Sequence, residues 1–182
     1  MSRLRTWSLV VLSTSALGLA ACGSSSSTST TTSAPSATTT PATTAGTIPA
    51  QDRSPAGKLG TEPTVTVPPG SPPTKLESSD LIVGTGPKAK AGDTVTVQYV
   101  LATYSSDKVI QASWSSQPFT FTLDSTSQPV IPGWDVGVVG MQVGGRRELI
   151  IPPSLGYGNK SPGSGIAAND TLVFVIDLLK IG

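Results

Sequence analysis

Alternation of apolar and polar residues predicts β-strands in the C-terminal part of the chain. Residues 94–100 and 118–123 alternate with a period of two, which gives each segment one apolar face and one face rich in Thr. Gly and Pro residues interrupt the pattern between apolar segments, as turns between strands do. Three further segments are expected to form strands: 81–83, 147–151 and 171–181.

Residues 133–141 have the one helical pattern in this region, because Trp134, Val138 and Met141 recur at i, i+4 and i+7. One short helix lying across a twisted antiparallel sheet of four to six strands is an α+β architecture. We assign this domain to residues 76–182, a normal length for one domain. Arg146 and Arg147 begin one of the strands and are expected to be solvated.

Residues 23–75 have few of the large apolar residues that a core requires. Ser, Thr and Pro dominate the segment, so burial is not expected to offset the entropy of ordering it. We interpret it as a disordered tether, about 40 Å from end to end if roughly 50 residues behave as a flexible coil. Its Ser and Thr residues are also candidates for O-glycosylation.

The first 22 residues have the form of a secretory signal peptide. Arg3 and Arg5 precede an apolar stretch that is too short for a spanning helix of about 20 apolar residues. The stretch ends in Leu19-Ala20-Ala21-Cys22, which resembles the bacterial lipobox. The resemblance implies cleavage before Cys22, lipidation of Cys22 and anchoring on the outer face of the cell membrane. The alternative is an ordinary signal peptide in which the Cys occurs by chance.

Composition excludes several kinds of chemistry. The chain has 182 residues with no His and one Cys, which rules out Ser-His-Asp and Cys-His catalysis, His-ligated zinc and an intramolecular disulfide. A formal net charge of +1 provides no basic face for nucleic acid. We therefore expect no nucleic-acid partner and a reaction that needs no imidazole.

Several motifs in the expected domain resemble the FKBP-type peptidyl-prolyl isomerases. The resemblance covers nearly all of residues 80–181, in order and with few gaps. It implies a twisted antiparallel sheet that curls round one helix, with an apolar hollow in which an X–Pro bond rotates between cis and trans. The motifs that carry it are Val130-Ile131-Pro132-Gly133-Trp134-Asp135, residues 139–147 and 151–158, the strand 170–179, and residues 84–86 and 91–99 near its start.

The resemblance also implies a set of site residues. Tyr157 is the hydroxyl donor to the substrate carbonyl, Trp134 is the floor of the pocket, and the backbone N–H of Ile131 is the second contact to ligands. The chain departs from the usual Phe-Asp of the family at Ile110 and Gln111. The expected catalytic residues are Tyr99, Trp134, Tyr157 and Phe174, and the expected pocket residues are Ile110, Gln111, Phe119, Val130, Ile131 and Ile166. Without the motif order, the aromatic residues among them would be read as ordinary core.

Rotation about an X–Pro bond must cross a barrier of about 18–20 kcal/mol, but it breaks no covalent bond. An apolar pocket with a few hydrogen-bond donors can hold the twisted amide better than the planar one, without a nucleophile, metal or cofactor. We therefore predict a monomeric, lipid-anchored isomerase that acts on proline-containing peptides and unfolded exported proteins and binds macrolide inhibitors. The alternatives are a chaperone that uses the same pocket with little turnover, and an unrelated adhesive lipoprotein.

Overall fold

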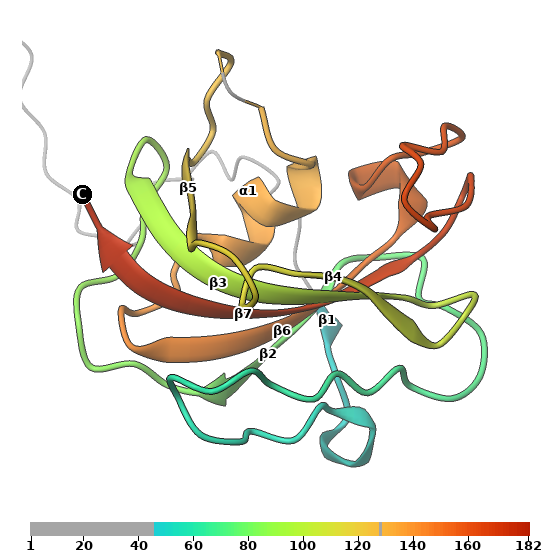
Figure 1. Ribbon diagram of the computed structural model, residues 1–182, viewed down its shortest axis with the longest axis horizontal. Coiled ribbons are helices and arrows are strands. Elements are labelled where there is room, and N and C mark those ends of the chain that lie inside the picture. Colours follow the sequence, from blue (N-terminus) through green and yellow to red (C-terminus); the bar gives the residue numbers. More distant parts are fainter. Residues whose placement is uncertain (1–45, 128) are drawn as a thin grey trace, which may run out of the picture. The chain divides into compact units, whose positions relative to one another are not determined.

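The computed structural model describes residues 46–127 and 129–182, so Cys22, the signal segment 1–22 and residues 23–45 lie outside it. Figure 1 shows a curved sheet with one α-helix against one face. The strands are β1 (Gly46–Thr47), β2 (Glu77–Ile82), β3 (Thr94–Thr103), β4 (Lys108–Ala112), β5 (Phe119–Thr122), β6 (Gly145–Ile151) and β7 (Leu172–Ile181). The helices are α1 (Pro132–Val138) and the 3₁₀ turns η1 (Ala50–Asp52) and η2 (Pro153–Leu155).

The sheet has seven strands in the order β1-β2-β6-β7-β3-β4, and β5 pairs with β3 beside this path. Every pair is antiparallel except β1 with β2, which run parallel over two residues. The predicted α+β class is confirmed. Strand number exceeds the expected four to six because the alternation pattern did not indicate the short strands β1 and β4.

Helix α1 packs closely on β6 because two glycines face that strand. A Cβ atom on Gly133 would lie 2.4 Å from Cγ2 of Ile151, and one on Gly137 would lie 2.5 Å from Cδ1 of Leu149. The helix ends at Val138, earlier than the pattern predicted. Trp134 and Val138 on the helix, and Met141 beyond its end, are all buried, as the periodicity predicts.

The main core fills the space between α1 and the sheet. Its members on β3, β6 and β7 alternate along each strand, so every second side chain points toward the helix. They include Val97, Leu149, Ile176 and Leu178, none more than 1% exposed. This core positions the helix and the strands that supply the pocket.

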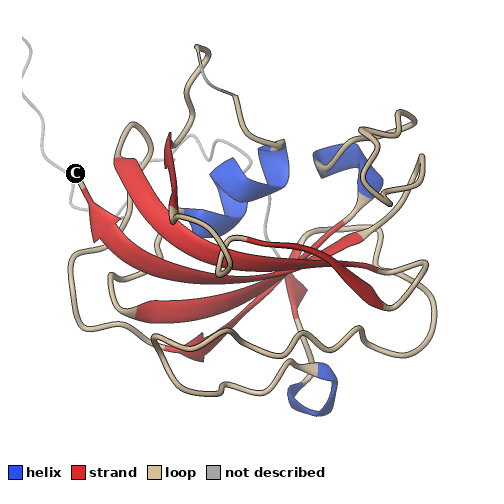
Figure 2. Cartoon of the chain, viewed as in Figure 1, coloured by secondary structure: helices blue, strands red, loops and turns tan. Residues whose placement is uncertain are grey.

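Residues 46–75, here called the strap, lie on the opposite face of the sheet. The composition places them in the disordered tether, but the structure packs them on the sheet, so the folded domain starts at least thirty residues before residue 76. Figure 2 shows the strap as a long loop that contains η1, on the side away from α1. Ile48 is fully buried and packs with Ile150 and Val173. The physical reason is that this second face of the sheet presents an apolar site, formed by Ile150 and Val173, which the composition of the strap alone does not reveal.

A buried ion pair lies beneath the strap. Arg146 is fully buried, and its guanidinium binds both carboxylate oxygens of Asp177. The same guanidinium donates to the carbonyls of Ala56 and Thr61 in the strap, each at 2.9 Å. The expectation that Arg146 is solvated is therefore wrong, because the strap covers it and provides two of its acceptors.

Glu148, also fully buried, attaches the strap at a second point. Its Oε1 accepts from the backbone N–H of Ser54 at 3.0 Å and from the Ser54 hydroxyl. Its Oε2 has no hydrogen-bond partner among the described residues. Burial raises the pKa of this carboxyl, whereas the hydrogen bonds from Ser54 and the charge of Arg53 act in the opposite direction.

Replacing the strap's buried isoleucine tests whether the strap belongs to the folded domain. We expect Ile48→Ala to lower the free energy of unfolding by about 2–5 kcal/mol, as emptying a buried aliphatic site does. Leu59→Ala, in the same strap but 38% exposed, is the matched control and should change it by less than about 0.5 kcal/mol. Denaturant unfolding of both variants measures this, and equal effects would contradict a packed strap.

Candidate functional site

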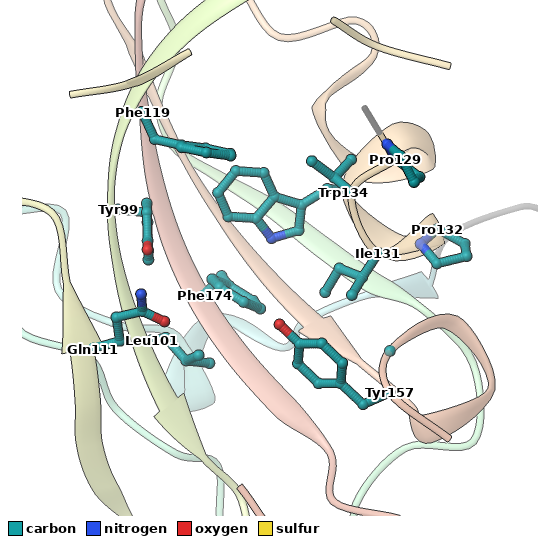
Figure 3. Close-up of a pocket in the computed structure, with 12 residues that line it drawn as sticks. Tyr99, Leu101, Gln111, Phe119, Pro129, Ile131, Pro132, Trp134, Tyr157 and Phe174 are labelled. Atoms are coloured by element: carbon teal, nitrogen blue, oxygen red, sulfur yellow. The ribbon is translucent and has the colours of Figure 1, made fainter. Parts of the chain in front are cut away.

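A hollow of about 540 Å³ opens on the helix side of the sheet. Figure 3 shows its side chains converging from β3, β4, β5, β7 and α1, and from the loops before α1 and after η2. It is lined by Tyr99, Leu101, Gln111, Phe119, Pro129, Val130, Ile131, Pro132, Trp134, Gly156, Tyr157 and Phe174. None of these twelve residues carries a formal charge.

Trp134 forms the floor of the hollow and is only 4% exposed. Its ring meets those of Tyr99 and Phe174 nearly at right angles, with centroid distances of 5.3 and 5.2 Å. Phe119 and Phe121 pack on it as well, at 5.9 and 5.2 Å. Edge-to-face contacts of this kind favour fixed ring orientations. The floor is therefore rigid, and its indole N–H is buried with no hydrogen-bond acceptor among the described residues.

Strands β3 and β7 place three wall residues side by side. Leu101 pairs with Phe174 across the antiparallel ladder, and Tyr99 lies two residues before Leu101 on the same face. The Tyr99 and Phe174 rings are 6.1 Å apart. The sheet therefore holds this wall by backbone pairing, independently of any ligand.

Tyr157 forms the opposite rim, on the turn that follows η2. Two backbone hydrogen bonds to Gly158 stabilise the turn: its N–H donates to Pro153 at 2.9 Å, and its carbonyl accepts from Asn169 at 2.8 Å. Gly158 has a φ of +60°, a conformation that glycine adopts without strain. Tyr157 is 39% exposed, and Figure 3 shows its hydroxyl pointing into the hollow.

The electrostatic character of the hollow is neutral. Burial raises the pKa of the Tyr99 hydroxyl above its ordinary value of 10.0, and the nearby Tyr157 adds to the effect. Tyr99 therefore stays protonated at any physiological pH. The hollow offers neutral hydrogen-bond donors and apolar surface, and its lining contains no carboxyl, imidazole, thiol or amino side chain.

Eight of the ten expected site residues line the hollow. Tyr99, Trp134, Tyr157 and Phe174 come together, and so do Gln111, Phe119, Val130 and Ile131. Ile166 is instead buried in the main core, and Ile110 is partly buried and packs against that core.

Four lining residues were not expected: Leu101, Pro129, Pro132 and Gly156. Leu101 continues the period-two alternation of Val97 and Tyr99 on the apolar face of β3, so the pattern itself could have identified it. Pro129 and Pro132 flank Val130 and Ile131, and only the path of this loop into α1 places them on the rim.

The described part of the chain contains no group of three or more His, Cys, Asp or Glu residues placed to hold a metal ion. Among the same residues, no helix has the length and hydropathy needed to cross a bilayer. What the hollow can do is bind a small apolar ring over Trp134 and present hydrogen-bond donors at its rim. A proline ring and its flanking carbonyls fit this arrangement.

Comparison with known proteins agrees with this geometry. The chain is 48% identical over 122 residues to an FK506-binding protein of Streptomyces anulatus, covering 66% of this chain and 97% of that one. It is 40% identical over 120 residues to a probable FK506-binding protein of Corynebacterium glutamicum, covering 65% and 98%. The crystal structure of a peptidyl-prolyl cis-trans isomerase from Pseudomonas syringae superposes with a TM-score of 0.52 at 34% identity, covering 59% of this chain and 75% of that one.

The strap lies outside the part of the chain that the family profile matches. That profile, for the FKBP-type peptidyl-prolyl cis-trans isomerases, matches residues 86–179, more than half of the chain, and includes every residue that lines the hollow. The chain belongs to the FKBP-type peptidyl-prolyl cis-trans isomerase family.

Proposed function

We propose that this isomerase is tethered to the cell membrane and assists the folding of exported proteins by rotating their X–Pro bonds. The neutral aromatic hollow with Trp134 as its floor is the observation that carries the catalytic part. The lipobox-like sequence ending in Cys22 carries the tethering part. A protein held there would meet chains as they emerge from export, before their X–Pro bonds have equilibrated.

The reaction requires stabilisation of a twisted amide. In the planar ground state resonance makes the amide strongly dipolar, and rotation removes that resonance. A hollow lined only by uncharged residues disfavours the dipolar form more than the twisted one, because it offers less solvation than water does. Binding that is stronger in the transition state than in the ground state accelerates the rotation.

The residues that line the hollow would contact different parts of the substrate. The proline ring rests on the indole of Trp134, between the rings of Tyr99 and Phe174. The Tyr157 hydroxyl donates to a carbonyl of the substrate, and the backbone N–H of Ile131 is the second contact. These contacts hold the segment on one side of the rotating bond, while the other side turns.

A second candidate function is a proline-binding chaperone with little turnover that uses the same pocket. Gln111 favours this candidate, because a neutral amide lines the hollow where the family usually has Asp. Isomerisation of the peptide Ala-Leu-Pro-Phe separates the two functions. Acceleration above the spontaneous rate supports the isomerase, and saturable binding without acceleration supports the chaperone.

We also propose that macrolides bind this hollow, as the names of the FK506-binding relatives indicate for those proteins.

Removing the Tyr157 hydroxyl should slow catalysis without unfolding the domain. A neutral hydrogen bond contributes about 0.5–1.5 kcal/mol net, so we expect Tyr157→Phe to lower kcat/KM by about 2- to 12-fold. Tyr104→Phe is the matched control, because Tyr104 packs beside Ile48 on the strap side of the sheet. Peptide isomerisation assays on both variants provide the measurement, and an equal loss in both would argue against a role for the Tyr157 hydroxyl.

The rate should depend little on pH. The lining of the hollow contains no carboxyl, imidazole, thiol or amino side chain, and the raised pKa of Tyr99 keeps that hydroxyl protonated. We therefore expect kcat/KM to be nearly constant between about pH 6 and pH 8.5 for a peptide without ionising groups. Assays at half-unit steps check this, and a slope near tenfold per pH unit on a folded protein would indicate a proton transfer.

The proposed anchor depends on one residue. Cys22 is the single cysteine of the chain, so we expect Cys22→Ala to abolish lipidation and to release the protein from membranes or leave it unprocessed. Detergent partitioning and intact-mass measurement of the wild-type protein and of the Cys22→Ala variant check this. Recovery of the wild-type protein in the aqueous phase with an unmodified Cys22 thiol would contradict the anchor.

A further inference from the structure

The side of α1 that faces away from the sheet is apolar. Pro132, Val136 and Val139 recur there at i, i+4 and i+7, and we call these three residues the outer stripe. All three are exposed, Val136 and Val139 to 39% each. Figure 1 shows α1 lying against one face of the sheet, so its other side is turned away from the strands.

A helix that packs on one side only usually presents polar residues on the other side. Here Trp134 and Val138 are buried in the main core, and the opposite side is apolar as well. Asp135 is the single charged residue between Pro132 and Val139. Exposed apolar residues that adjoin one another are typical of a binding surface, so the outer stripe calls for a partner.

The outer stripe is continuous with the hollow. Pro132 belongs to both, because it lines the hollow and is also the first residue of the stripe. Figure 3 shows it next to Ile131, at the start of the helix. The stripe extends about 10 Å from there, since each helical residue rises about 1.5 Å. An extended chain covers that length with about three residues, so a chain with its proline in the hollow can reach Val139.

The partner that fits is the unfolded segment around the bound proline. An X–Pro bond that still has to rotate lies in a chain that has not finished folding, so apolar side chains near that proline are not yet buried. A substrate of this kind brings the proline ring to the hollow and apolar side chains to the stripe in one binding event.

Charge beside the stripe disfavours an anionic lipid surface as the partner. The Oδ1 of Asp135 accepts from the backbone N–H of Asp124 at 2.8 Å, so two acidic residues lie together there. Arg147 reaches the carbonyl of Val139 but is already paired with Asp80. An uncharged apolar segment meets no such repulsion.

We propose that the outer stripe binds apolar side chains of the substrate polypeptide about three to five residues away from the proline held in the hollow. The inference rests on the proposed function and extends its substrate from a single X–Pro bond to an unfolded apolar segment. Because the stripe does not touch the rotating bond, its contacts are equal in the ground state and the transition state. They should therefore lower KM and leave kcat unchanged.

The test compares peptides that carry apolar residues at this distance from proline. Leu-Ser-Leu-Ser-Leu-Pro-Phe and Ala-Leu-Pro-Phe-Ser-Leu-Ser-Leu place them before and after the proline, and alternate residues of an extended chain point to the same side. In each control peptide Ser replaces the two distant Leu residues. For at least one peptide we expect kcat/KM about 5- to 10-fold above its control, through KM. The full chain carries Cys22→Ala, so that neither lipid nor detergent covers the stripe.

Variants of the stripe identify the surface. Val136→Ser/Val139→Ser should reduce the advantage of the Leu peptide over its control to less than about twofold. Val83→Ser is the matched control and should retain the advantage, because Val83 is 66% exposed and lies between β2 and β3. If the double variant does not fold, Val136→Thr, which keeps the shape of valine, should reduce the advantage by about twofold.

Failure of this inference is distinguishable from failure of the proposed function. If the protein isomerises Ala-Leu-Pro-Phe but treats the Leu and Ser peptides alike, or if the double variant retains the advantage, the inference is overturned and the proposed function stands. Absence of isomerisation with every peptide would overturn both. Flotation with phosphatidylcholine vesicles, or a dimer in sedimentation, that the double variant loses would assign the stripe to a membrane or to a second copy and would also overturn the inference.

Discussion

The close contact between α1 and β6 is the constraint on which the pocket depends. Gly133 and Gly137 allow the helix to approach the side chains of Ile151 and Leu149 more closely than any residue with a Cβ could. This contact fixes the height of Trp134 above the sheet, and the rings of the hollow are arranged around that indole. A helix displaced by the width of a methyl group would open the floor, because close-packed aromatic contacts lose attraction steeply with distance.

The buried charged residues of strands β6 and β7 lie on the face away from the helix, because successive side chains of a strand point to opposite faces. Leu149 and Phe174 point toward the helix, where the hollow stays neutral. Arg146, Glu148 and Asp177 point toward the strap, where they are buried. The domain thus keeps its buried charges on the other side of the sheet.

Burial of these charges makes the strap part of the domain instead of a linker. Removing water from an ion pair costs several kcal/mol unless further hydrogen bonds replace the lost solvation. The strap provides such bonds to Arg146 from the carbonyls of Ala56 and Thr61. The family profile begins at residue 86, whereas the strap precedes that residue and covers the second face of the sheet. The proposed tether is correspondingly shorter, because the folded part begins no later than residue 46.

Local pattern in the sequence determined the α+β class, the four long strands and the helix face, because period-two and helical repeats report which side of an element is buried. The order of the family motifs, not the periodicity, indicated most of the pocket residues. Tertiary structure alone decided the features that depend on partners distant in sequence. Arg146 looks like a solvated strand start until the strap, about 90 residues earlier in the chain, is placed over it. Ile48 stands among polar residues typical of disorder, and only the apolar pair Ile150 and Val173 on the far face of the sheet makes its burial favourable. Whether a side chain is buried depends on the surface that covers it, and a short stretch of sequence does not contain that surface.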